Sequence, residues 1–140
     1  ALVSVAVLFE AFRHTHFIAY PPGERVLIRI GRQSEGLERV LHSLNAHTWA
    51  FITAFNPKGK ETSPEANQHA DRALVEELRA KGLRTFSGEG KADVGGWPAE
   101  PSHLIVGIGR DDAIELAQRF GQAALAIGER GEPAKLVLPD

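Results

Sequence analysis

A strand-like segment that ends at an Asn-Pro turn constrains this chain more than any other feature. Residues 48–55 (TWAFITAF) are dominated by β-branched and aromatic side chains, which favour β-strands. Pro57 cannot donate to a strand ladder, so the strand is expected to end at Asn56. The last polar side chains, those of Thr53 and Asn56, are then delivered to the end of a buried strand, where α/β proteins commonly place ligand sites.

The rest of the chain alternates helical and strand patterns. Ser34 and Ser63 are predicted N-caps, and Pro64 occupies a favoured first helical position. From residue 49 to 127 the predicted order is β-α-β-β-α-β, which is typical of a ferredoxin-like α/β sandwich, an α+β fold. An N-terminal helix, a β-α unit and a C-terminal strand would extend this core. The predicted strands are 25–30, 48–55, 83–87, 104–108, 123–127 and 135–138, and the predicted helices are 1–12, 35–44, 64–80 and 110–120.

Length and composition limit the classes of protein to which this chain can belong. Its 140 residues predict a single domain, residues 1–140, that buries roughly 70% of its unfolded surface. The net charge is -2 and no cluster of Lys or Arg stands out, which disfavours nucleic-acid binding. The absence of cysteine excludes disulfides, thiolate catalysis and Cys-based zinc sites, and it is compatible with a reducing cytoplasm.

The apolar segment 1–12 invites a membrane interpretation, which its length and flanks disfavour. A membrane span needs about 20 apolar residues, and a signal peptide would begin with a basic region that is missing here. Leu2, Val5, Ala6, Phe9 and Phe12 instead follow helical spacing. We therefore expect an amphipathic first helix, no membrane partner and a cytoplasmic location.

Motifs for metal binding, cofactors or nucleophilic catalysis are weak. The six histidines include no pair at helical i, i+4 spacing with a glutamate between them, so no metal site is predicted. No Gly-x-Ser-x-Gly elbow follows a strand, and Gly107-Ile108-Gly109 lacks the remainder of a dinucleotide fingerprint. We accordingly predict no cofactor and assign no reaction class.

A second polar segment is expected to meet the end of the first strand. Residues 97–103 (WPAEPSH) follow a glycine-rich segment, 88–96, that is predicted to be a loop, and they lead into a strand. In the predicted topology this strand is the antiparallel neighbour of 48–55, which brings Trp97, Glu100 and Ser102 towards Thr53 and Asn56. Each of these residues also has an ordinary structural interpretation, as a core lid, an ion pair or a turn cap. Gln122 enters the last core strand, where a buried amide would need partners such as Asn56 or Glu100.

The same residues resemble a bacterial family of short proteins known as domain of unknown function 3293. The resemblance covers about residues 49–138 and implies no established activity, substrate or cofactor. It adds Asn67 to the candidate site. The matching residues are Ile52–Pro57, Ser63, Asn67, Trp97, Glu100, Ser102 and Phe120–Ala123. Two positions depart from the family pattern: Ala66 stands where that pattern has an acidic residue, and Gly59 where it has a serine.

Two functions from different classes follow. The first is a module that binds a small polar or anionic ligand through Thr53, Asn56, Asn67, Trp97, Ser102 and Gln122. Glu100 is its candidate catalytic acid or base, because a carboxyl beside an indole and under a loop is expected to have a raised pKa. The alternative is a protein-protein interaction or oligomerisation module without catalytic activity, which would use the apolar first helix or the edge strand 135–138.

Overall fold

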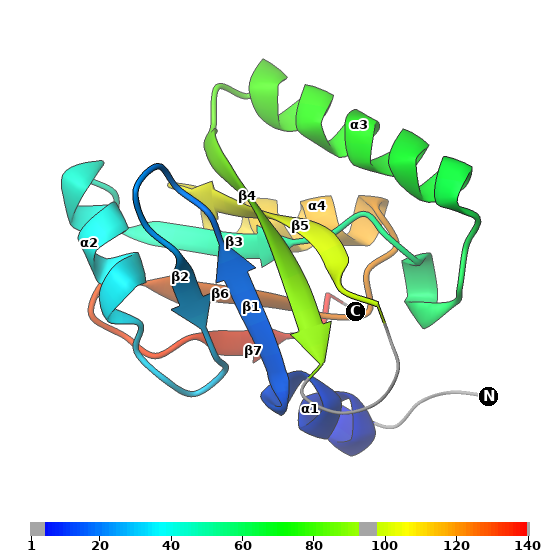
Figure 1. The fold of residues 1–140 in the computed structure, drawn as a ribbon, viewed down its shortest axis with the longest axis horizontal. Coiled ribbons are helices and arrows are strands. Elements are labelled where there is room, and N and C mark those ends of the chain that lie inside the picture. The colour runs from blue at the N-terminus through cyan, green and yellow to red at the C-terminus, as the bar shows by residue number, and fades with distance from the viewer. Residues whose placement is uncertain (1–4, 93–97, 140) are drawn as a thin grey trace.

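The protein folds around one curled sheet of seven strands. The computed structural model describes residues 5–92 and 98–139. The strands lie in the order β2-β1-β4-β5-β3-β6-β7, and all neighbouring pairs are antiparallel (Figure 1). The strands are β1 (Thr15–Ala19), β2 (Val26–Ile28), β3 (Thr48–Ile52), β4 (Arg84–Ala92), β5 (Glu100–Val106), β6 (Leu125–Glu129) and β7 (Lys135–Val137).

Four α-helices and one short 3-10 helix accompany the sheet in the described part of the chain. They are α1 (Val5–Arg13), α2 (Glu35–Ser43), η1 (Pro57–Gly59), α3 (Pro64–Ala80) and α4 (Arg110–Arg119). The predicted α+β class is confirmed, whereas the ferredoxin-like classification stays a prediction. Within residues 5–92 and 98–139, no helix combines the length and the apolar character that a bilayer crossing requires.

The sheet curls because its two outer strands approach each other at one end. A bridge joins Ile30, just after β2, to Ala134, just before β7. Two backbone hydrogen bonds flank it: Gly31 N donates to Ala134 O at 2.8 Å, and Ala134 N donates to Arg32 O at 3.1 Å. The curl gives the sheet a concave and a convex face, which alternate residues of each strand occupy.

The convex face is covered by α3 and α4. The buried side chains of Ala50, Ile52 and Ile105 pack there against Leu74 of α3 and Leu116 of α4. Both helices begin as local signals dictate: the Ser63 side chain accepts a hydrogen bond from Ala66 N at 3.1 Å, and Gly109 is the N-cap of α4. The apolar residues of α3 that the sequence predicts to face inward are Ala66, Ala70, Ala73, Leu74 and Leu78. The prediction was wrong at Ala66 and Ala73, which are exposed, while Asn67 is buried.

The concave face encloses a second core. Its members come from strands far apart in the sheet, and α2 covers one end of it. The Ser34 hydroxyl accepts from Leu37 N at 3.2 Å, which confirms the predicted cap of α2. The buried residues of this core are Phe17, Ala19, Val26, Ile28, Ile30, Leu37, Val40, Leu41, Trp49, Phe51, Leu104, Val106, Ala126 and Ala134.

Two predictions about the N-terminal half of the sheet were wrong. Residues 88–92, predicted as loop, form the second half of β4, and β1 was not predicted at all. Tertiary packing explains the difference, because β4 lies between β1 and β5 and a Cβ at Gly88 would meet Ile18 O at 2.3 Å. Glycine therefore permits a close strand approach here instead of ending the strand. The rest of the predicted loop, 93–97, lies outside the described residues.

The predicted N-terminal helix is present from Val5, and two of the positions predicted to face inward are exposed. Phe12 is partly buried and stacks on Phe17 with ring centroids 6.2 Å apart. Phe9, predicted to face inward, is 45% exposed, and Ala6 is exposed as well. Figure 1 shows α1 below the start of β1 and the end of β4. Phe12, in the last turn of α1, makes the contact with Phe17 of β1.

Candidate functional site

A cavity of about 460 Å³ opens at the end of the concave face that α1 borders. Its volume lies within the range of small-molecule sites, roughly 300–1,000 Å³. The wall combines three aromatic rings and several alanines with one carboxyl, two amides and three hydroxyls. The lining residues are Ala11, Phe12, Thr15, Phe17, Phe51, Thr53, Asn56, Gly59, Gly90, Ala92, Pro98, Glu100, Ser102, Gln122 and Ala123–Ala126.

The cavity exists because β4 presents almost no side chains to it. Gly90 pairs with Phe17 on one side and with Glu100 on the other, so these three residues form one row across β1, β4 and β5. A Cβ built on Gly90 would find only the Phe17 ring within 4 Å, at 3.8 and 3.9 Å. The missing side chain leaves space between an aromatic ring and a carboxyl.

Five of the seven predicted site residues line this cavity. They are Thr53, Asn56, Glu100, Ser102 and Gln122. The antiparallel pairing of β3 with β5, with Ile52 opposite His103, brings the two polar segments together as expected. Asn67 lies behind Asn56, and Trp97 lies outside the described residues. The roles of all seven in binding or catalysis stay predictions.

Asn67 fixes the orientation of Asn56. The Asn67 side-chain oxygen accepts from Asn56 N at 2.9 Å, and its amide donates to the Asn56 side-chain oxygen at 3.0 Å. That same Asn56 oxygen also accepts from Thr62 N at 3.0 Å. Because Asn67 is only 5% exposed, this network is rigid, and it directs the amide hydrogens of Asn56 away from α3. A backbone φ of 48° at Asn56, in the region that Asn tolerates, shapes the turn.

Glu100 is the titratable group of the cavity wall. Burial raises the pKa of its carboxyl above the ordinary value, and a hydrogen bond from the Asn56 side chain partly offsets that rise. Among the described lining residues there is no Lys, Arg or His to neutralise the carboxylate. The pKa of Glu100 is therefore perturbed in the direction that suits acid-base chemistry near neutral pH.

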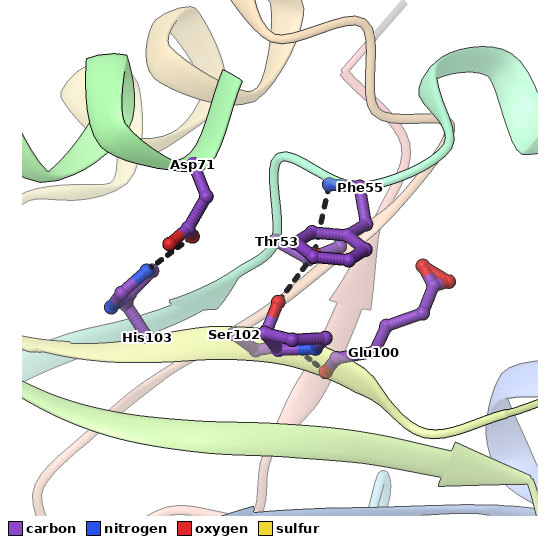
Figure 2. Close-up of polar contacts among 7 residues, drawn as sticks. Thr53, Phe55, Asp71, Glu100, Ser102 and His103 are labelled. Atoms are coloured by element: carbon purple, nitrogen blue, oxygen red, sulfur yellow. Dashed lines mark hydrogen bonds and ion pairs between the residues drawn. The ribbon is translucent and has the colours of Figure 1, made fainter. Parts of the chain in front are cut away.

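Two hydroxyl groups beside Glu100 are held by hydrogen bonds to the backbone. Thr53 Oγ1 donates to Pro101 O at 2.7 Å and accepts from Phe55 N at 3.0 Å. Ser102, which is 3% exposed, donates its hydroxyl to Glu100 O at 2.9 Å (Figure 2). These bonds lock the rotamers of both hydroxyl groups, and with no histidine or lysine in the described wall, neither is activated as a nucleophile.

Gln122 turns its amide nitrogen towards the protein. Its Nε2 donates to Phe55 O and to Phe120 O, each at 3.2 Å. These backbone carbonyls take the place of Asn56 and Glu100, which the sequence suggested as partners. They tie the end of β3 to the chain that enters β6, and they leave the side-chain oxygen of Gln122 at the cavity.

His103 and Asp71 form a separate pair on the convex face. His103 Nε2 lies 2.7 Å from Asp71 Oδ1, between β5 and α3. Figure 2 shows this pair on the other side of Thr53 from the Glu100 side chain, which points away from it. The carboxylate of Asp71 thus has a basic partner, and it takes no part in the cavity. No cluster of three or more potential metal ligands occurs in the ranges 5–92 and 98–139.

Sequence reasoning missed the apolar half of the site. Phe12, Phe17 and Phe51 line the cavity, with the Phe17 and Phe51 rings in edge contact at a centroid distance of 5.4 Å. The helical spacing of the first helix did indicate that Phe12 faces the rest of the protein. The positions of Phe17 and Gly90 could not be predicted, because β1 was not predicted. Only the pairing of β1 with β4 puts both residues on the concave face.

Comparison with known proteins agrees with the family resemblance and adds no activity. A family model described as "Protein of unknown function (DUF3293)" matches residues 52–125, more than half of the chain. The search of curated proteins and the search of solved structures each gave no significant match. The match includes all five polar residues that we predicted and that line the cavity, and the three aromatic residues lie outside it.

Proposed function

This chain belongs to the DUF3293 family of proteins of unknown function, and we propose that it binds a small polar molecule in the cavity at the open end of its curled sheet. The observation that carries the proposal is the convergence of a carboxyl, two amides and two hydroxyls, from β5 and the ends of β3 and α4, on one hollow of about 460 Å³. Few polar groups in a mostly apolar wall are the usual composition of a small-molecule site.

Glu100 is the residue with which a bound molecule would exchange a proton. Its raised pKa and its contact with Asn56 suit a general acid or base. Because the described wall offers no activated nucleophile and no cluster of metal ligands, proton transfer is the chemistry that these residues support. Simple binding without turnover needs the same groups.

A cavity-filling substitution tests the proposal. We expect Gly90→Leu to abolish thermal stabilisation by any nucleotide, sugar or amino-acid metabolite that stabilises the native protein. Lys91→Leu is the matched control, because it adds the same side chain to the next residue of β4, on the opposite face. Stabilisation that survives in Gly90→Leu, or indifference of the native protein to the whole panel, would contradict the proposal.

One observation favours the interaction module as a second candidate. Val7 and Phe9 of α1 are 59% and 45% exposed, so this short helix presents two large apolar side chains to solvent. If the protein assembles through this helix, replacing both residues by serine should lower the molar mass that light scattering measures, while binding in the cavity persists. An unchanged mass would remove this candidate.

A further inference from the structure

Resting on the proposed function, we infer that the cavity selects a small molecule that carries a protonated amine on a compact apolar body. Three independent properties of the wall point to this class: its charge, its hydrogen-bonding capacity and its aromatic rings. Each is set by residues of the chain that the structure describes.

The part of the wall that the structure describes can carry negative charge but no positive charge. Glu100 is the lone ionisable side chain among the described lining residues, and no cationic side chain accompanies it. A carboxylate or phosphate ligand would enter a partly desolvated space with a like charge and no counter-ion, which is strongly unfavourable. A cation would instead supply the partner that Glu100 lacks within the protein.

The hydroxyl groups of the wall can only accept hydrogen bonds from a ligand, because their own protons are already donated to the backbone. Thr15, Thr53 and Ser102 each donate their single hydroxyl proton to a backbone carbonyl, at 2.8, 2.7 and 2.9 Å respectively. A hydroxyl has one proton to donate and two lone pairs to accept with, so its remaining capacity in the cavity is for a donor on the ligand.

The amides reinforce this preference. Both amide hydrogens of Gln122 are directed to backbone carbonyls, which leaves its side-chain oxygen free to accept. The amide of Asn56 is fixed by a backbone donor, Thr62 N, on its oxygen, and its hydrogens point to Glu100. An ammonium group, with three donors and no acceptor, complements such a wall, whereas a carboxylate does not.

The aromatic rings suit the rest of the ligand. Phe12, Phe17 and Phe51 form a continuous group, with centroid distances of 6.2 Å and 5.4 Å between successive rings. Gly90 leaves open space between Phe17 and Glu100. An apolar body can pack on the rings, and their faces also attract a nearby cation.

Three probes of matched shape test the inference. We would titrate 2-phenylethylamine, 2-phenylethanol and phenylacetate into the native protein by isothermal calorimetry. The amine is expected to bind at least tenfold more tightly than the alcohol, and the carboxylate more weakly than either. Glu100→Gln should remove the advantage of the amine over the alcohol, because the amide carries no charge to pair with the ammonium group. Glu76→Gln, the same change at an exposed position of α3, should leave all three affinities unaltered.

The outcomes separate this inference from the proposed function. If the alcohol or the carboxylate binds as well as the amine, and Gly90→Leu abolishes that binding, the cavity is a ligand site but the preference for amines is overturned. An amine preference that persists in Glu100→Gln would overturn it as well. If no probe binds the native protein at millimolar concentration, the amine inference is overturned, and the proposed function is decided separately by the thermal-shift panel with Gly90→Leu.

Discussion

On the convex face of the sheet, Ala50, Ile52 and Ile105 pack against two helices, while on the concave face the alternate residues of the same strands leave a cavity of about 460 Å³ beyond Phe51. The difference arises from what covers each face. Helices α3 and α4 bring the buried leucines Leu74, Leu78 and Leu116 to the convex face. At the open end of the concave face, α1 contributes Ala11 and Phe12 of its last turn to the wall. The hollow forms where Ala11 and Phe12 are the described α-helical residues in the wall and where Gly90 of β4 has no side chain.

The carboxylates on the two faces also differ in whether they have a basic partner. Asp71 on the convex side is paired with His103 at 2.7 Å. Glu100 on the concave side has an amide neighbour and no basic residue in the described wall. A paired carboxylate contributes to structure, whereas a buried one without a cation is costly and is more typical of a functional site.

The largest expected change in stability comes from removing a packed side chain from one face, and it is compared with the same kind of removal from the other face. Leu74→Ala, in the fully buried convex core, should lower the free energy of unfolding by about 3 kcal/mol. Phe12→Ala should cost only about 1 kcal/mol, because its ring is partly exposed and already borders empty space. Urea denaturation measures both. Equal losses would mean that the concave end is as well packed as the convex core.

Two glycines of β4 sharpen the comparison. Gly88→Ala should cost about 2 kcal/mol, because the added Cβ would lie 2.3 Å from Ile18 O and force the strands apart. Gly90→Ala should change stability by less than about 1 kcal/mol, since its Cβ would make only ordinary contacts with Phe17. Thermal unfolding of the pair measures the contrast. A reversed order would contradict the placement of Gly90 at the cavity.

Asn67 connects the faces, since it belongs to α3 and holds Asn56 at the cavity. Asn67→Ala removes the acceptor of the buried Asn56 N, and should cost about 1.5 kcal/mol. Gln68→Ala, its exposed neighbour on the same helix, is the control and should be nearly neutral. We also expect weaker ligand binding in Asn67→Ala alone, measured by calorimetry. Loss of stability with full binding would restrict Asn67 to a structural role.

The smallest effect concerns pH. A glutamate whose pKa is raised on folding binds protons more tightly in the native state, so its ionisation removes stability as the pH rises from its ordinary pKa of 4.5 through the raised value. Glu100→Gln should therefore be more stable than the native protein at neutral pH, and the gain should vanish below about pH 4.5. Denaturation midpoints between pH 4 and 8 measure it. A gain that does not depend on pH would exclude the ionisation of Glu100 as its cause.

Local signals account for what could be predicted from the sequence. The caps at Ser34 and Ser63 depend on neighbouring residues, and these predictions were correct. The strand predicted over residues 48–55 is present as well, although it ends earlier, at Ile52. The meeting of Thr53 with residues 100–102 followed from the order of elements alone. Such features need no knowledge of distant packing.

Long-range pairing accounts for what was missed. β1 is a strand because β2 and β4 bond to its two sides, and the glycines of β4 are extended because β1 approaches them closely. Periodicity within residues 15–19 or 88–92 cannot reveal either partner. The aromatic wall of the cavity depends on this pairing, and so it could not be predicted, although the polar wall was.

The contact between Ile30 and Ala134 joins parts of the chain that are more than a hundred residues apart. We expect a contact of such high order to form late, because the intervening chain must first lose its freedom. The curvature that shelters the hollow is then expected near the end of folding. A molecule that recognises the hollow should consequently leave the refolding rate unchanged and slow unfolding instead.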